Sequence, residues 1–256
     1  MRAIVTGASS GIGQETARIL QVSGWEVFGL SRRGTAPEGV RGVSVDVTDP
    51  AAVKRVIDEI ASDGVSIDLL INNAGFGIAG PIETTSPDDA ARQMNVNFLG
   101  QFYVARAVLP YMRAAKKGRI LCISSVAGQI AIPYQAFYSA SKAAVLSFAL
   151  ALRNETADFG ICVSAILPGD VQTGFTDARS KADYGAYTRA EASIASMEKD
   201  ERSGLKPTDV SAVIMKAASA VHPAPIYVVG GKYKLFSVLF KLLPARFAYW
   251  IVKKMY

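Results

Sequence analysis

RAIVTGASSGIG, at residues 2–13, joins a short apolar run to a turn rich in glycine. The run from Arg2 to Val5 predicts a buried strand, and the segment QETARILQVSG after Gly13 predicts a helix that Gly24 closes. Glycines allow a tight turn and let a diphosphate approach the helix N-terminus, whose free N–H groups attract anions. A glycine turn taken alone is equally compatible with a plain structural role. The rest of the chain must therefore decide whether this turn binds a diphosphate.

Six further apolar runs predict strands, and four periodic segments predict helices between them. The strands are expected at 26–30, 42–45, 69–71, 120–123, 162–167 and 226–229, and the helices at about 49–62, 88–115, 139–159 and 209–219. Parallel neighbours in a sheet require crossover connections of this kind. The pattern predicts an α/β fold with a doubly wound parallel sheet of about seven strands flanked by helices, as a single domain over 1–256.

Polar residues follow two of these strands. Asn72-Asn73-Ala74-Gly75 comes after one, and Ser124-Ser125 after another. In an open α/β sheet, ligands bind at the carboxyl ends of the strands, so these residues are candidates for a site.

A tyrosine and a lysine four residues apart, Tyr138 and Lys142, share one face of a predicted helix. Free tyrosine has a pKa of about 10, and a neighbouring ammonium group favours its ionised form. The pair is therefore a candidate acid–base unit, although Tyr-x-x-x-Lys also occurs on ordinary amphipathic surface helices.

The motifs taken together resemble the short-chain dehydrogenase/reductase family, over nearly the whole chain. They are Thr6-Gly7-x-x-x-Gly11-x-Gly13, Asn72-Asn73-Ala74-Gly75, Asn97, Ser125, Tyr138-x-x-x-Lys142 and Pro168-Gly169. The resemblance implies a Rossmann-type fold in which Tyr138 transfers a proton to or from the substrate oxygen that Ser125 holds. It implies that Lys142 lowers the tyrosine pKa and binds the nicotinamide ribose, and that Asn97 positions a relay water. Ser124 and Asn95 are the alternatives to Ser125 and Asn97.

The end of the second strand bears on the choice of cofactor. An acidic residue there binds the ribose 2′-hydroxyl of NAD, whereas this chain has Ser31-Arg32-Arg33, which suits a 2′-phosphate. The family pattern likewise points to NADP(H), and a solvated loop is the alternative for the two arginines. The residues expected to bind the cofactor are Gly7, Ser9, Ser10, Gly11, Ile12, Gly13, Ser31, Arg32, Asp46, Val47, Asn73, Ala74, Gly75, Tyr138, Lys142, Pro168, Gly169, Val171 and Thr173.

Composition excludes several other classes of protein. Cys122 and Cys162 lie in apolar strands and are expected to be buried, and the single histidine, His222, has no partner nearby, so we expect neither a disulfide nor a metal site. No run of 18 apolar residues occurs, and the first strand leaves no room for a signal peptide, which favours a cytoplasmic protein.

Two segments carry information about the substrate. Residues 170–206 match the family's variable substrate lid, and their aromatic residues suit an apolar ligand or simply pack between short helices. Residues 232–256 form an apolar, basic extension; seven Lys/Arg and no Asp/Glu occur from residue 210 onward, in a chain of net charge +6. This extension could contact a membrane peripherally, close over the pocket, or pack on the body or on a second subunit. Because the basic excess is confined to an apolar segment, nucleic acid is not expected as a partner.

The sequence thus predicts an NADP(H)-dependent oxidoreductase that interconverts an alcohol with a ketone or aldehyde. The extension is similar to those of hydroxysteroid and retinol dehydrogenase-like members, which favours an apolar steroid-, retinoid- or lipid-like substrate. We also expect a homo-oligomer. The alternatives are a 3-oxoacyl thioester reductase and a non-catalytic NADP(H)-sensing regulator.

Overall fold

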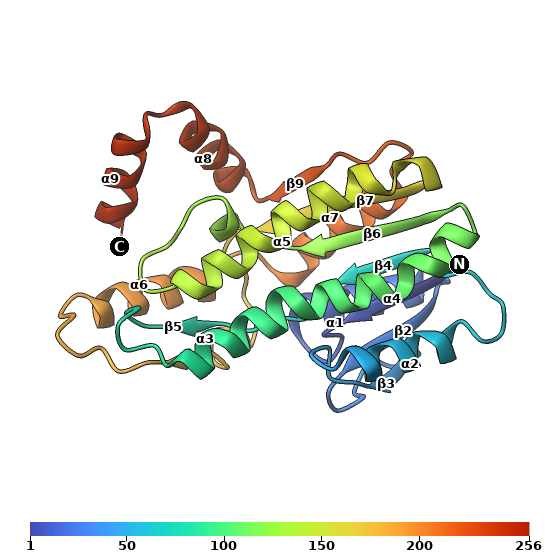
Figure 1. Ribbon diagram of the computed structural model, residues 1–256. Coiled ribbons are helices and arrows are strands. Elements are labelled where there is room, and N and C mark those ends of the chain that lie inside the picture. The colour runs from blue at the N-terminus through green and yellow to red at the C-terminus, as the bar shows by residue number, and fades with distance from the viewer. Residues whose placement is uncertain (256) are drawn as a thin grey trace.

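Seven parallel strands form the central sheet in the computed structural model, which describes residues 1–255 (Figure 1). Their order is β3-β2-β1-β4-β6-β7-β9, so the chain winds outward from β1 in one direction, then returns and winds outward in the other. The predicted doubly wound parallel sheet is confirmed. The strands are β1 (Arg2–Thr6), β2 (Glu26–Ser31), β3 (Arg41–Ser44), β4 (Leu69–Asn72), β6 (Gly118–Ile123), β7 (Ile161–Pro168) and β9 (Ile226–Val229).

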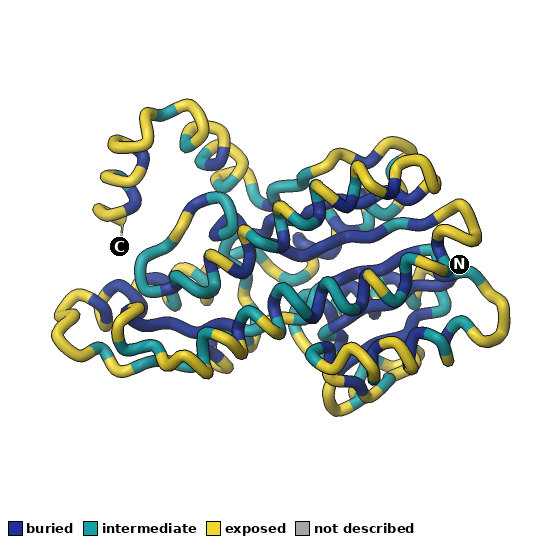
Figure 2. Tube along the Cα trace, in the orientation of Figure 1, coloured by how far each residue is buried: buried dark blue, intermediate teal, exposed yellow. Residues whose placement is uncertain are grey.

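Helices cover both faces of this sheet. One apolar cluster packs α2 (Pro50–Ile60), α4 (Gly100–Ala114) and α5 (Ala136–Glu155) against one face, and a second packs α1 (Gly11–Val22) and α7 (Pro207–Ser219) against the other. The central strands β1, β4 and β6 are almost continuously buried (Figure 2). Burial on both faces explains why these strands are apolar runs without polar alternation.

Helix α1 begins earlier than predicted, at Gly11 within the glycine turn. The predicted helix over 88–115 is divided into α3 (Pro87–Met94), a π-helical turn (Asn95–Leu99) and α4. Apolar periodicity did not reveal this turn, because one extra residue hardly disturbs the pattern.

Smaller elements surround the carboxyl ends of the strands. Within residues 170–206, β8 (Ser180–Lys181) pairs with β5 (Ile78–Ala79), and α6 (Ala190–Arg202) follows. The C-terminal extension forms α8 (Gly231–Leu242) and α9 (Ala245–Met255), which project from the body in Figure 1, and its last residue, Tyr256, lies outside the described residues.

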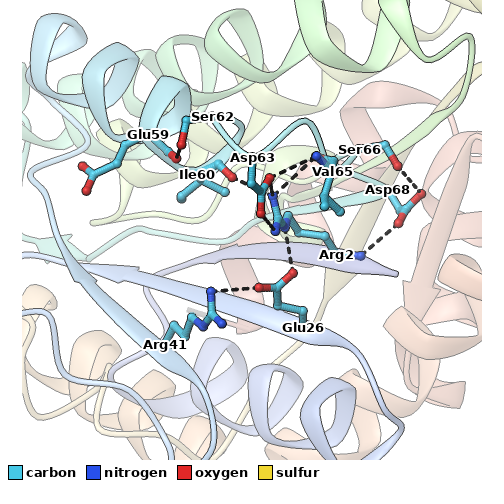
Figure 3. Close-up of polar contacts among 10 residues, drawn as sticks. All are labelled: Arg2, Glu26, Arg41, Glu59, Ile60, Ser62, Asp63, Val65, Ser66 and Asp68. Atoms are coloured by element: carbon cyan, nitrogen blue, oxygen red, sulfur yellow. Dashed lines mark hydrogen bonds and ion pairs between the residues drawn. The ribbon is translucent and has the colours of Figure 1, made fainter.

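An ionic cluster ties together the opposite, amino end of the sheet (Figure 3). Arg2 is 2% exposed; its Nη1 donates to Asp63 Oδ1 at 2.7 Å and its Nε to Glu26 Oε2 at 2.9 Å. The guanidinium holds the pKa of the Asp63 carboxyl well below its usual range. These contacts fasten the loop after α2 to β1 and β2, at the edge away from the candidate site.

The two cysteines differ in burial. Cys122 is buried on β6, and burial raises the pKa of its thiol to about 12. Cys162 is partly exposed, so the prediction that both are buried is wrong for it. Strand β9 pairs with β7 only from Ala165 onward, which leaves the start of β7 less covered.

Candidate active site

A cavity of about 1600 Å³ opens at the carboxyl ends of the strands. Its wall includes every predicted site residue except Gly13 and Asn97. Residues far apart in the chain are thereby brought to one place, as expected where the strand order reverses in a doubly wound sheet.

The glycine turn at one end of the cavity fits a diphosphate. A Cβ atom on Gly13 would lie 2.3 Å from the Gly7 carbonyl oxygen, so only glycine permits this close packing, and Gly7 itself has a φ of +68°. Ser10, at the N-cap of α1, makes no side-chain capping bond, and the first turn contains no acidic residue. The N–H groups and positive end of the helix dipole therefore remain available for an anion.

Thr6 connects this turn to the end of β4. Its hydroxyl oxygen accepts hydrogen bonds from the backbone N–H groups of Asn73 at 2.8 Å and Ala74 at 2.9 Å, and Asn73 Nδ2 donates to the Thr6 carbonyl at 2.9 Å. Thr6 is completely buried. Thr6 is the first residue of the glycine motif, and its role could not be predicted from the sequence. In the structure it joins two walls of the cavity, the glycine turn and the end of β4.

Arg32 lies exposed at the end of β2, in the cavity wall, and makes no ion pair within residues 1–255. The neighbouring Ser31 is buried, and its hydroxyl donates to the Thr35 carbonyl at 3.1 Å. Asp46, further along the wall, accepts hydrogen bonds from the backbone and side chain of Thr48. A free guanidinium here suits a phosphate.

Ser125, Tyr138 and Lys142 meet at the other end of the cavity. The Ser125 hydroxyl donates to the Pro168 carbonyl at 3.4 Å and accepts from the Ala127 N–H at 3.1 Å. Lys142 Nζ lies 5.8 Å from the centroid of the Tyr138 ring and donates to the Ile123 carbonyl at 2.9 Å. The alternative serine, Ser124, is buried, and its hydroxyl donates to the Lys142 carbonyl at 2.7 Å.

The protonation of this pair differs from the expectation. Burial raises the pKa of Tyr138 to about 12, although the Ser125 hydroxyl acts in the opposite direction. Burial also lowers the pKa of Lys142 to about 8. The Tyr138 pKa is thus raised, not lowered as expected from Lys142, because the phenol loses its solvent.

Asn97 lies in the π-helical turn, fully buried, behind the cavity wall. Its Oδ1 accepts from the Phe76 N–H at 2.9 Å, and its Nδ2 donates to the Phe76 carbonyl and the Ser141 hydroxyl, both at 3.0 Å. Ser141 in turn donates to the Tyr138 carbonyl at 2.8 Å. The amide thus connects the loop after β4 to the helix that carries Tyr138.

Residues 1–183 match the model of the short chain dehydrogenase family. The chain belongs to this family. A 3-ketodihydrosphingosine reductase of Bacteroides thetaiotaomicron is 42% identical over 226 residues, which are 86% of this chain and 84% of that one. A crystal structure of a short-chain dehydrogenase from Streptomyces avermitilis superposes with a TM-score of 0.83 at 28% identity and covers 94% of both chains.

As a short-chain dehydrogenase, the protein is an oxidoreductase that uses a nicotinamide cofactor. Family membership does not decide between NAD and NADP. A similar structure from Burkholderia phymatum, with a TM-score of 0.77, 28% identity and 88% of each chain covered, is a complex with NAD.

The C-terminal extension of this short-chain dehydrogenase lines the cavity with its inner side. The lining residues are Lys232, Tyr233, Phe236, Val252 and Met255. The Tyr233 ring lies directly on Gly169, where a Cβ atom would be 2.2 Å from the ring, so the glycine after Pro168 makes room for α8. Within the lid, Phe175 packs 5.7 Å from the Tyr138 ring, while Ile194 and Met197 are buried in a small apolar cluster.

Proposed function

We propose that this protein is an NADP(H)-dependent enzyme that interconverts a long-chain, apolar carbonyl compound and its alcohol. The observation that carries the proposal is the group of apolar side chains that line the cavity together with Tyr138, to which Tyr233 and Phe236 of the extension contribute. The similarity to a 3-ketodihydrosphingosine reductase supports a lipid-like ketone among the apolar substrates considered.

The proposed chemistry divides among the residues around Tyr138. When bound, a nicotinamide cofactor supplies or accepts the hydride. Tyr138 donates its phenolic proton to the carbonyl oxygen during reduction and takes the hydroxyl proton back during oxidation. Ser125 holds that oxygen, and Lys142 supplies positive charge beside the tyrosine and binds the cofactor's ribose. The relay water at Asn97 stays a prediction.

The glycine turn, Asn73 to Gly75 and the segment from Pro168 to Thr173 are proposed to hold the dinucleotide. Arg32, unpaired and exposed in the cavity wall, supports NADP(H) because it is available for a 2′-phosphate. Asp46 is proposed to meet the adenine.

The proposal is tested with a panel of carbonyl compounds and NADPH absorbance. Long-chain 3-ketones should be reduced with a higher kcat/KM than 3-oxoacyl thioesters, retinal or small ketones. Preference for the thioesters would replace the proposal by the alternative reductase. Tight NADPH binding without turnover of any substrate would favour the regulator.

The outer side of the extension supports peripheral membrane contact. Among residues 1–255, no helix is both long and apolar enough to cross a bilayer. The extension nevertheless exposes many large apolar side chains beside its lysines, which suits an anionic lipid surface. The exposed residues on this side are Leu235, Val238, Leu239, Leu242, Phe247, Tyr249 and Trp250.

A homo-oligomer is proposed from the outer side of α4 and α5. Phe102 and Phe148 lie edge-to-face there with ring centroids 6.3 Å apart, and both are only partly buried. Partly buried aromatic residues are typical of interface cores. Light scattering coupled to size exclusion tests this; a monomer at micromolar concentration would contradict it.

A further inference from the structure

Five carboxylates line the cavity, and one differs from the rest. Asp46, Asp88 and Asp200 are exposed, whereas Glu201 pairs with Arg179 and accepts a hydrogen bond from Thr176. The fifth, Asp170, is partly buried and forms no ion pair within residues 1–255. A partly buried carboxylate without an ion-pair partner favours the binding of a cation, which makes Asp170 a candidate contact for a positively charged group.

Asp170 is held firmly in this position. Its carbonyl accepts from the Leu205 N–H at 2.9 Å, and a Cβ atom on Gly204 would lie 2.4 Å from that carbonyl oxygen, so the lid packs closely here. Its Oδ2 accepts a hydrogen bond from the Tyr233 hydroxyl. Since the Tyr233 ring rests on Gly169, the carboxylate is clamped between the end of β7 and α8. The other oxygen, Oδ1, receives no hydrogen bond from residues 1–255.

Asp170 lines the same cavity as Tyr138. The negative charges of Glu201 and Asp170 both add to the rise in the Tyr138 pKa, after the larger effect of burial. Burial raises the pKa of Asp170 itself, and Lys232 opposes this rise. Lys232 lies 4.7 Å from the centroid of the Tyr233 ring. Apolar side chains, a proton donor and the Asp170 carboxylate therefore line one cavity.

We propose that Asp170 binds the protonated amino group of a long-chain amino ketone, and that the Tyr233 hydroxyl positions the carboxylate for it. This inference rests on the proposed function and names the polar end of its substrate. The ammonium donates to Asp170 while the alkyl chain lies along Phe236 and the neighbouring apolar wall. The amino group thereby orients the carbonyl toward Tyr138.

The test compares two ketones of equal chain length, 3-ketodihydrosphingosine, whose amino group is on the carbon next to the carbonyl, and the 3-ketone without that amino group. The measured quantity is kcat/KM for the amino ketone divided by kcat/KM for the plain ketone. In Asp170→Asn this ratio should fall about 10- to 100-fold, which is the effect of losing one hydrogen bond between charged groups. Tyr233→Phe should lower the ratio by less. Asp88→Asn, which removes an exposed carboxylate from the wall of the same cavity, is the matched control and should leave the ratio unchanged.

Equal losses on both ketones in Asp170→Asn would overturn the inference, because they would assign Asp170 a structural role. A fall in NADPH affinity without a change in the ratio would also overturn it, in favour of a contact with the cofactor. A wild-type enzyme that reduces the plain ketone but not the amino ketone would contradict the inference while the proposed function stands.

Measuring ligand affinity without turnover tests the role of Asp170 even if the proposed reaction is wrong. Even if neither ketone is reduced, a long-chain 2-amino alcohol should bind the NADPH complex more tightly than the alcohol without the amine, and Asp170→Asn should remove the difference. Equal affinity of wild type for the two ligands in calorimetry would overturn the inference.

Discussion

At the residue scale, the site combines an acid and a base whose charged forms are both destabilised by burial. Tyr138 has a raised pKa and Lys142 a lowered one, so at neutral pH the phenol keeps its proton while the ammonium is still charged but loses its proton more readily than a solvated lysine. A cavity that holds its acid protonated is suited to donate a proton to a carbonyl oxygen.

Tyr138→Phe should lower kcat by about 10²- to 10⁴-fold, since it removes the only proposed proton donor, while NADPH affinity stays close to wild type. Steady-state rates and fluorescence titration measure the two effects. Tyr134→Phe, a nearby tyrosine ahead of the same helix, is the control. A Tyr138→Phe enzyme that keeps more than a tenth of the wild-type kcat would refute the assignment.

Lys142 makes the stability of the protein depend on pH. Its pKa is about 8 in the folded protein against an ordinary value of 10.5, so between these values the unfolded chain binds more protons and stability rises with pH. Wild type should therefore gain stability relative to Lys142→Met from pH 8 to pH 10. Urea unfolding at several pH values measures this; a constant difference would show that the ammonium is not strained by burial.

Arg32→Ala should weaken NADPH binding by about 1.5–3 kcal/mol through the loss of a hydrogen bond to a phosphate. NADH lacks that phosphate and serves as the internal control. Calorimetric titration should find wild type selective for NADPH and the variant much less so. Equal affinities of wild type for both cofactors would reject the proposed preference.

At the element scale, α8 presents two sides to different surroundings. Phe236 lines the cavity, whereas Leu235, its neighbour, is 62% exposed. Figure 2 shows the same division along α8 and α9, with mostly exposed backbone and a few buried positions. The extension is thus part of the cavity wall and a surface at once.

This division predicts opposite outcomes for neighbouring substitutions. Phe236→Ala should lower kcat/KM for long-chain ketones about ten-fold or more, because burial of an aromatic ring is worth about 1.5–3 kcal/mol, with vesicle binding retained. Leu235→Ala should instead weaken salt-sensitive co-sedimentation with anionic vesicles and leave the kinetics unchanged. If both variants behave alike in both assays, the two sides do not have separate roles.

At the scale of the whole molecule, the carboxyl ends of the strands hold the site and the amino ends hold the ionic cluster of Figure 3. The cluster concentrates its bonds on Arg2, the first residue of β1. The ionic cluster and the candidate site therefore lie at opposite ends of the strands of one sheet.

Asp63→Asn should lower the urea midpoint at pH 7. The folded-state pKa of Asp63 is depressed, so its stabilisation is present above the unfolded value of about 3.9 and is lost as the pH falls toward the folded value. The difference in stability between wild type and Asp63→Asn should consequently become smaller below about pH 4. Glu38→Gln, at an exposed carboxylate, is the control; a deficit independent of pH would contradict the assigned ion pair.

The strands and the glycine turn could be predicted because buried parallel strands leave plain apolar runs and Gly13 is sterically obligatory. The position of the C-terminal extension could not be predicted, because its residues are equally suited to contact with a membrane, a pocket or a second subunit. The direction of the Tyr138 pKa also escaped prediction: spacing gives the distance to Lys142 but not the loss of water around the phenol.

The π-helical turn has a consequence for how the length of this chain can vary. Such a turn contains one residue more than an α-helical turn. Deleting any one residue of Asn95–Leu99 would let α3 and α4 merge into a continuous α-helix, and because the wider turn already accommodates the extra residue, both helices would keep their present faces toward the body. The wider turn would be lost, however, and the amide of Asn97 would no longer reach Phe76 and Ser141 together. A single deletion here would therefore leave a well-formed helix without the link between the loop after β4 and α5, so gaps in descendants of this sequence should avoid these five positions.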